Sequence, residues 1–187
     1  MDEIKFCFDQ SLISKEQIHQ LSSQIIEEIK NIQWATEMGY DDVRASVNLP
    51  IDDKAAEQVL ALVDEKNKLD PRYIVVVGIG GSNLGTLAVF EAILGKKHNL
   101  KTNQKKILFA DTVDSDLIYD IKNIIEPVLQ NDEHIILNVV SKSGSTTETI
   151  TNFEIPLSLL ENYSNHPEDS VVVTTDYDSK LWHLAKE

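Results

Sequence analysis

The stretch YIVVVGIGGSNLG, from Tyr73 to Gly85, decides the fold of this chain. Within it, Ile74 to Val77 form an apolar run rich in β-branched residues, with no polar alternation. Such a run is typical of a strand buried on both faces, as strands are in a parallel sheet covered by helices. The run stops at three glycines within four positions, 78, 80 and 81, which indicates a tight loop.

A helix is expected directly after this loop. Ser82 and Asn83 open it, and its predicted apolar stripe consists of Leu84, Leu87, Ala88 and Ile93. The glycines permit positive φ and a close approach of the backbone, so several N–H groups can point at one spot. Together with the positive end of the helix dipole, these groups predict an anion site, and hence a phosphate-bearing ligand.

The loop has three other interpretations. A dinucleotide fingerprint requires glycine at the sixth position counted from Gly78 as the first, where this chain has Asn83, although Asp111 ends the next strand as a ribose-binding acid would. A P-loop requires Gly-Lys-Ser/Thr, which does not follow. The third alternative is a tight turn that binds nothing.

Composition restricts the class of protein. The 187 residues are 42% hydrophobic and 26% charged, which is ordinary for one globular domain, with or without a small appendage. The formal net charge of -14 argues against nucleic acid or an anionic membrane as a partner. We expect a cytoplasmic protein, because the sequence shows neither a secretory signal nor a run of ~18 apolar residues.

Cysteine and histidine do not suggest a metal site. Cys7 is the only cysteine, so neither an intrachain disulfide nor a thiolate cluster is expected. The five histidines lack the spacing of known metal motifs and are interpreted as surface residues: His19, His98, His134, His166 and His183. We therefore expect no metal and no organic cofactor.

Residues 1–70 are predicted to form a helical segment that packs on the sheet or folds over its ligand edge. An amphipathic helix is expected from Ser14 to about Met38, with Ser14 and Gln17 as a capping box. An irregular piece and a second helix, Asp52 to Leu69, follow. The dipeptide Asp70-Pro71 should end that helix.

Residues 71–187 alternate strands with helices. Further strands are expected at 106–111, 134–140 and 170–175, and helices at 114–129, at 146–163 with an interruption at Pro156, and from Asp178. Such a βαβ series predicts right-handed connections and a three-layer αβα sandwich. We expect an α/β fold with a flavodoxin-like parallel sheet in the order 2-1-3-4.

A second loop follows the third strand. It reads SKSGSTTET, Ser141 to Thr149, and carries hydroxyls at six of nine positions. In the order 2-1-3-4 the winding reverses between strands one and three, so both loops should face one pocket at their carboxyl ends. Hydroxyls and amides suit a phosphate dianion. The alternative is a well-capped helix, with Ser145 as N-cap and Glu148 completing the capping box.

Because of these two loops, the chain resembles the glucose-6-phosphate isomerase family over at least Val43 to Glu187. GIGGSNLG and SKSGSTTET are similar to the two sugar-phosphate loops of the family's N-terminal sugar-isomerase (SIS) domain. The resemblance implies a substrate site for glucose 6-phosphate and fructose 6-phosphate, with Ser143 and Thr146 on the phosphate. Its implied residues are Gly81, Ser82, Ser141, Lys142, Ser143, Gly144, Ser145 and Thr146.

The resemblance also implies what lies elsewhere. In the family the fifth strand of this domain and the catalytic arginine, glutamate, histidine and lysine come later in the chain, so no catalytic residue is assigned here. Glu148 is the one acid in the loops and is better explained as a cap. The intact enzyme is expected to be a homodimer that isomerises the two sugar phosphates through an enediol, without a cofactor. The alternative is a regulatory module that binds a phosphosugar without converting it.

Overall fold

The computed structural model describes residue 7 and residues 10–102 and 104–186. The chain divides into two compact units, residues 1–60 and 61–187. The division falls inside helix α2 (Asp53–Asn67), and the domain boundary expected at residue 70 stays a prediction.

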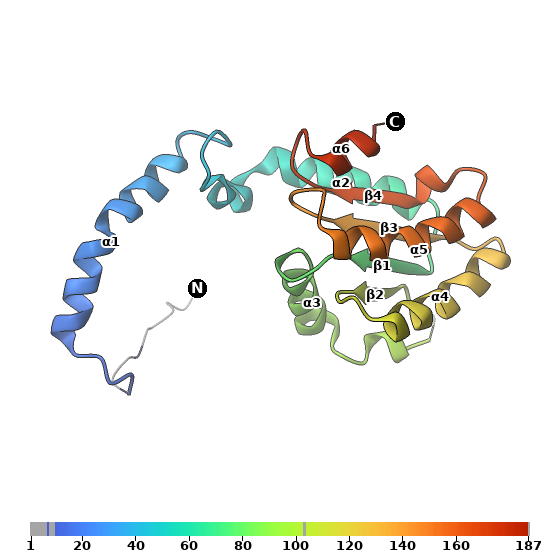
Figure 1. The fold of residues 1–187 in the computed structure, drawn as a ribbon, viewed down its shortest axis with the longest axis horizontal. Helices are drawn as coiled ribbons and strands as arrows, with labels where there is room; N and C mark the ends of the chain where they lie inside the picture. The colour runs from blue at the N-terminus through green and yellow to red at the C-terminus, as the bar shows by residue number, and fades with distance from the viewer. Residues whose placement is uncertain (1–6, 8–9, 103, 187) are drawn as a thin grey trace. The chain divides into compact units, whose positions relative to one another are not determined.

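The larger unit is built on a four-stranded parallel sheet (Figure 1). Its strands are β1 (Tyr73–Val77), β2 (Lys106–Ala110), β3 (Ile135–Val140) and β4 (Val171–Thr174), in the order β2-β1-β3-β4. Val77 is level with Ala110 on one side and with Val139 on the other, so the carboxyl ends of these strands form one edge. The predicted α/β class, parallel pairing and strand order are confirmed, and β4 lies at an edge of the sheet.

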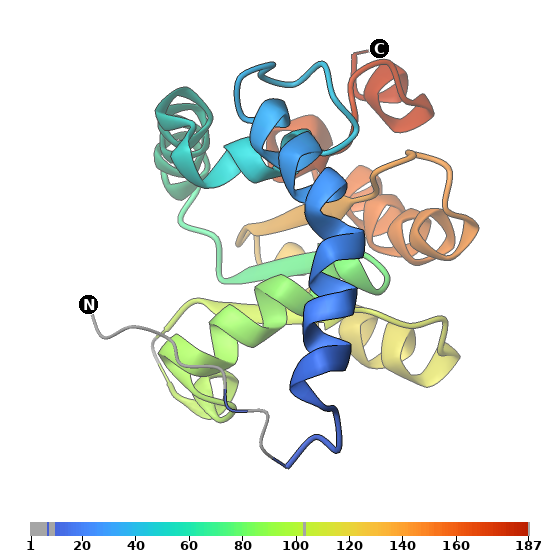
Figure 2. The same ribbon diagram turned by 90° about the vertical axis from the view of Figure 1, so that its left-hand side faces the viewer.

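Helices cover both faces of the sheet (Figure 2). The larger unit contains α3 (Gly81–Leu94), α4 (Ser115–Gln130), α5 (Thr147–Tyr163) and α6 (Lys180–Leu184). Short 3₁₀ turns, η2 (His98–Leu100) and η3 (Pro167–Ser170), lie in the connections. α4 and α5 lie side by side on one face, and α3 lies on the other.

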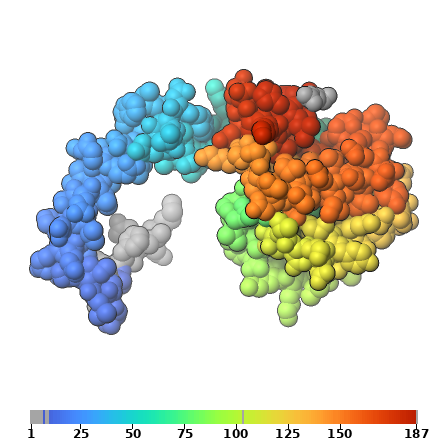
Figure 3. Space-filling model, in the orientation of Figure 1, coloured from blue at the N-terminus to red at the C-terminus, as the bar shows by residue number. Residues whose placement is uncertain are grey.

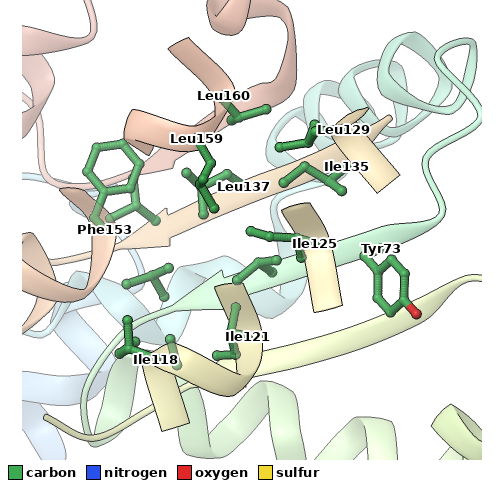
Figure 4. Close-up of a cluster of buried hydrophobic side chains, with 14 of the residues drawn as sticks. Tyr73, Ile118, Ile121, Ile125, Leu129, Ile135, Leu137, Phe153, Leu159 and Leu160 are labelled. Carbon is green, nitrogen blue, oxygen red and sulfur yellow. The ribbon is translucent and has the colours of Figure 1, made fainter. Parts of the chain in front are cut away.

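The main core lies between the sheet and the pair α4 and α5 (Figure 4). Alternate residues of β1 and β3 point into it because side chains alternate along a strand. From the helices come Ile118, Ile121, Ile125 and Leu129 of α4 and Phe153, Leu159 and Leu160 of α5. Burying each such side chain stabilises the fold by about 1.5–3 kcal/mol, so this packing holds the strand ends in place.

The stripe predicted for α3 is wrong in part. Leu84 is 61% exposed and Ile93 is 75% exposed, whereas Asn83 and Phe90 are buried. Nearly every residue of this helix after Ser82 and Asn83 is apolar or small, so its sequence does not single out one face. The helix also begins earlier than expected, at Gly81.

Three smaller expectations also fail. Pro156 does not interrupt α5, which runs unbroken to Tyr163 with Pro156 buried inside it. The last helix is shorter than expected and begins at Lys180 after the cap Ser179. His98 is buried rather than on the surface, because its Nε2 lies 2.9 Å from the carbonyl oxygen of Lys105.

The smaller unit contains α1 (Lys15–Ala35), the 3₁₀ helix η1 (Ala45–Ile51) and the start of α2. The capping box of Ser14 and Gln17 is confirmed, with both hydrogen bonds present. Arg44 binds Glu28 through Nε and Nη2, at 2.6 and 2.9 Å. None of the helices that the structure describes is long and apolar enough to cross a membrane.

Candidate functional site

The two predicted loops leave neighbouring strands at the same edge of the sheet. The first follows β1 and the second follows β3, and these strands are paired in parallel. Gly78 lies between the loops: a Cβ at this position would be 3.1 Å from the Cβ of Ser82 and 3.2 Å from the carbonyl oxygen of Val140. The first loop is therefore packed directly against the end of β3, and a larger residue would push it away.

Gly80 and Asn83 shape the first loop. Gly80 is the N-cap of α3 and has a φ of 56°, a conformation that favours glycine. The buried side chain of Asn83 donates from Nδ2 to the carbonyl oxygen of Gly78 at 3.0 Å, which ties the helix back to the strand end. Gly81 is exposed and Ser82 is half-buried at the first turn of α3. No side chain caps the start of α3, and the N–H groups of Ser82 and Asn83 donate to the carbonyl oxygens of Ile79 and Gly80, at 3.2 and 3.0 Å.

The second loop is anchored at Ser141. This residue is only 2% exposed, and its N–H donates to the carbonyl oxygen of Thr174 at 3.0 Å. Its hydroxyl donates to Oγ1 of Thr146 at 3.3 Å, so the two ends of the loop are joined. Between them, Lys142, Ser143 and Ser145 are exposed, and Oγ of Ser143 accepts from Oγ of Ser145 at 3.2 Å. The exposed hydroxyls of Ser143 and Ser145 and the ammonium group of Lys142 therefore lie on a loop whose two ends are joined by a hydrogen bond.

The start of α5 differs from the prediction. The N-cap is Thr146, not Ser145, and its side chain makes no capping hydrogen bond. Glu148 consequently lies at the second helical position, so the expected capping box of Ser145 and Glu148 is wrong. The physical reason is Gly144, whose φ of 64° turns the chain before the helix can begin. The first-turn N–H groups of α5 are left without a side-chain acceptor.

Residues after β4 hold the second loop from behind, and the sequence motifs did not indicate them. Thr175 donates from Oγ1 to the carbonyl oxygen of Ser141 at 2.6 Å, and its Oγ1 lies 2.7 Å from Oγ of Ser179. The N–H of Asp176 donates to the carbonyl oxygen of Lys142 at 3.1 Å. The one available signal was the strand order, which places the segments after β3 and β4 beside each other.

Gly144 is the point of closest packing. It is buried, and a Cβ there would lie 2.6 Å from the backbone nitrogen of Leu181 and 2.7 Å from Oγ of Ser179. Distances of this kind leave no room for any side chain. The resemblance assigned Gly144 to the substrate site, and its place in the structure is at the back of the loop, against α6.

The loop reaches the surface of the molecule in the space-filling view, where the chain from β3 into α5 is orange (Figure 3). A cavity of about 450 Å³ adjoins it, lined by residues of the loop, α5 and α6, among them Ser145, Thr147 and Lys180. A larger cavity, of about 780 Å³, lies at the opposite edge of the sheet. Among the residues described here, no three His, Cys, Asp or Glu side chains form a group that could hold a metal ion.

The sheet order and the loops define the class of protein. This is an open, doubly wound α/β domain with two loops at the point where the winding reverses, which is where such domains bind ligands. A family model described as phosphoglucose isomerase matches residues 67–176. The chain belongs to the phosphoglucose isomerase family.

Curated relatives agree with this assignment. The chain is 32% identical over 172 residues to a glucose-6-phosphate isomerase of Fusobacterium nucleatum, covering 89% of this chain and 37% of the relative. It is 38% identical over 148 residues to one of Leptospira biflexa, covering 75% and 32%. The chain therefore spans about a third of the length of the relatives that it matches.

Solved structures show the same fold. A glucose-6-phosphate isomerase from Chlamydia trachomatis superposes with a TM-score of 0.60 at 20% identity, covering 90% of this chain and 36% of that one. A hypothetical protein from Thermus thermophilus superposes with a TM-score of 0.61 at 23% identity, covering 89% and 38%.

Proposed function

We propose that this chain is the amino-terminal part of a glucose-6-phosphate isomerase and that its second loop binds the phosphate of glucose 6-phosphate and fructose 6-phosphate. The observation that carries the proposal is the uncapped start of α5, where Thr146 makes no capping hydrogen bond. Free N–H groups at the positive end of a helix attract an anion. Family membership indicates which anion this is.

In this proposal the phosphate dianion accepts hydrogen bonds from the first turn of α5 and from the hydroxyls of Ser143 and Thr146. Ser145 and Lys142 lie beside them on the exposed side of the loop. A hydrogen bond to a charged group contributes roughly 1.5–3 kcal/mol, so three or four donors are enough for specific binding. Gly81 and Ser82, at the open start of α3, contact the sugar.

Ser141 and Gly144 have a different part in the proposal. Both are buried, so they shape the loop rather than touch the sugar phosphate. Ser141 joins the two ends of the loop through its bond to Thr146, and Gly144 allows the turn against α6. Substituting either one would act on binding through the position of the donors.

The intact protein would catalyse aldose–ketose isomerisation in glycolysis and gluconeogenesis, in the cytoplasm and as a homodimer. This reaction moves a proton between adjacent carbons, which needs a base within about 3 Å of the hydrogen and groups that stabilise the enediolate. In the two loops only Lys142 and Glu148 carry an acidic or basic side chain, and both are exposed. We therefore propose that residues 1–187 alone bind substrate without converting it.

A phosphosugar-binding regulatory module is the second candidate. The observation that favours it is the same shortage of titratable groups in the two loops. One measurement distinguishes the two candidates. Residues 1–187 are joined in one polypeptide to the rest of an isomerase, and the isomerase activity of that polypeptide is measured. A regulatory module would bind the sugar phosphate and give no turnover in that arrangement.

Calorimetry with glucose 6-phosphate tests the binding step, with glucose as the matched ligand that lacks the phosphate. We expect glucose 6-phosphate to bind with a Kd on the order of 1 mM, about -4 kcal/mol, and glucose not to bind detectably. Equal binding of the two would remove the phosphate from the interaction and refute the proposal. A coupled assay tests the catalytic step, and turnover by residues 1–187 that Glu148→Gln abolishes would make Glu148 the base.

A further inference from the structure

Positive charge is concentrated in two short segments of this acidic chain. Residues 66–72 and 96–106 contain eight of the 17 lysines and arginines and a single acid, Asp70. The chain as a whole carries 31 acids and a net charge of -14. Such an uneven distribution is an electrostatic feature in its own right, because charges that lie together create a local field of their own.

The fold brings these two segments together at the amino-terminal ends of β1 and β2. The N–H of Lys106 donates to the carbonyl oxygen of Arg72 at 3.1 Å. Lys105 reaches across with Nζ, which donates to Oδ1 of Asn67 at 2.9 Å. This edge is opposite to the candidate phosphate site, since a five-residue strand separates the two ends by roughly 15 Å.

The cavity of about 780 Å³ lies at this edge. Arg72, Lys105, Lys106 and His134 line it, together with the hydroxyl-bearing Thr102 and the amide-bearing Gln104. Its volume falls within the range of pockets that hold small ligands, about 300–1,000 Å³. Every one of these side chains can donate a hydrogen bond, and three of them carry a full positive charge.

Acids at the cavity neutralise only part of this charge. Oε2 of Glu133 lies 2.8 Å from Nη1 of Arg72, and Oδ1 of Asp70 lies 3.7 Å from Nζ of Lys105. With residues 131–134 of the adjoining turn included, these segments contain eight lysines and arginines and three acids, against nine and 28 in the rest of the chain. Two of the eight are paired with acids just outside the segments, Lys66 with Glu65 at 3.1 Å and Lys96 with Glu91 at 3.5 Å. The ion pairs of Arg72 and Lys105 also hold these two side chains at the rim of the cavity.

We propose that this cavity binds a small multivalent anion of the polyphosphate type. The distribution of charge on the chain favours a small anion over a long one. Beyond the Debye length of about 8 Å at physiological salt a charge is largely screened, so a small ligand is governed by the cationic edge. A long polyanion would extend over surface where acids outnumber cations by about three to one, and would be repelled. Several charged groups are needed because each exposed ion pair contributes at most about 1 kcal/mol.

Calorimetry with inorganic tripolyphosphate tests the proposal on the full chain, in buffers of low and physiological salt. We expect one site per chain, with an affinity that falls as salt rises. The variant Lys105→Gln/Lys106→Gln should weaken binding at least about tenfold. This variant keeps Arg72 and its ion pair with Glu133 but loses the contacts of Lys105 with Asn67 and Asp70, so a circular dichroism melt checks the fold.

A charge-matched control separates the cavity from the general charge of the protein. Lys54→Gln/Lys122→Gln also removes two positive charges, both outside these segments and outside the lining of the cavity, and should leave the affinity within about twofold. Equal weakening by the two double variants would overturn the proposal, and so would a wild-type chain that does not bind tripolyphosphate.

A second control concerns the candidate phosphate site. Thr146→Asp places a carboxylate at that site and should leave tripolyphosphate binding unchanged. If Thr146→Asp abolished the binding, the anion would be held at the start of α5 and the cavity would not be its site. This outcome would leave the proposed function intact, so the two proposals can fail independently.

Discussion

The helices that follow β1, β2 and β3 all begin at the same edge of the sheet, and they begin in two different ways. α4 is capped by Asp114, whose Oδ1 accepts from the N–H groups of Asp116 at 2.8 Å and Leu117 at 3.3 Å. α3 and α5 begin at Gly80 and Thr146, and neither makes a side-chain capping bond. At α3 the N–H groups of Ser82 and Asn83 donate to the carbonyl oxygens of Ile79 and Gly80, at 3.2 and 3.0 Å. The start of α5 is therefore the one of the three that we propose to offer its N–H donors to a ligand.

The three helix starts also differ in the number of acidic side chains near them. Asp114 and Asp116 place two carboxylates at the start of α4, which satisfies its dipole and repels an anion. α3 has no acid in its first turn, and α5 has only the exposed Glu148. A side-chain cap contributes about 1 kcal/mol to stability, and α5 forgoes it. A bound anion would supply the missing acceptor.

The largest effect is expected from the glycine behind the open helix start. Gly144→Ala should lower the free energy of unfolding by about 3 kcal/mol, because alanine is strained at positive φ and its Cβ would meet the backbone of Leu181. Gly81→Ala is the matched control, since a Cβ there meets nothing within 4 Å. Urea unfolding measures both. Equal losses of unfolding free energy in the two variants would show that the effect comes from replacing a glycine as such, and not from the close packing at Gly144.

Capping the open start should remove ligand binding. Thr146→Asp places a carboxylate where the phosphate is proposed to lie, so glucose 6-phosphate should bind at least about tenfold more weakly, a loss of about 1.4 kcal/mol or more. The same change gives α5 a good N-cap and should raise the free energy of unfolding by about 0.5–1 kcal/mol. Calorimetry and urea unfolding measure the two effects.

Ser115→Asp is the control for that variant, because it adds the same charge to the start of α4. We expect it to leave binding of glucose 6-phosphate unchanged. If Thr146→Asp bound the ligand as well as the wild type, the second loop would be excluded from the phosphate site.

Opening the capped start should have the reverse pattern. Asp114→Ala removes the acceptor for two N–H groups of α4 and should cost about 1 kcal/mol of stability. Binding of glucose 6-phosphate should stay the same, since α4 is not part of the proposed site. A loss of affinity that exceeds the loss of stability would instead place the start of α4 in the site.

The smallest effect concerns a capped helix in the other unit. Backbone hydrogen bonding at the start of α1, and then Ser14, lowers the pKa of Glu16 below its ordinary value of 4.5. A carboxyl whose pKa is lower in the folded state stabilises the fold above its unfolded pKa, and this contribution disappears as pH falls through the folded pKa. Stability measured from pH 7 down to pH 3 should fall slightly more for the wild type than for Glu16→Gln. Parallel curves would show that this carboxyl does not contribute.

Much of the fold could be predicted because its signals are local. The apolar runs of β1 and β3 are bounded by glycine or hydroxyl residues, and the intervening segments are long enough for helices. Parallel order then followed from the rules of βαβ connection. The position of the two loops could be predicted for the same reason, since both follow strands that the sheet order makes neighbours.

Other features could not be predicted, because they depend on contacts between distant segments. His98 is buried by its bond to Lys105 and by the ring of Phe90, whose centroid lies 5.6 Å away. A motif search has no pattern for such a contact. The sequence of α3 likewise does not show which face of the helix is buried, because nearly all of its residues are apolar or small. The packing of Phe90 and the sheet beneath the helix decide which face that is.

The order of the strands, the edge at which the loops lie and the family of the chain could all be inferred from the residues alone, because each depends on local patterns. The start of α5 could not, because it depends on contacts between distant segments. In the sequence, Ser145 and Glu148 have the spacing of a capping box. In the structure, Gly144 has a positive φ and packs against α6. Thr175, 34 residues further along the chain, donates a hydrogen bond to the carbonyl oxygen of Ser141. An N-cap contributes only about 1 kcal/mol to stability, and a hydrogen bond between distant segments contributes a similar amount. Such a bond is therefore sufficient to change the residue at which a helix begins.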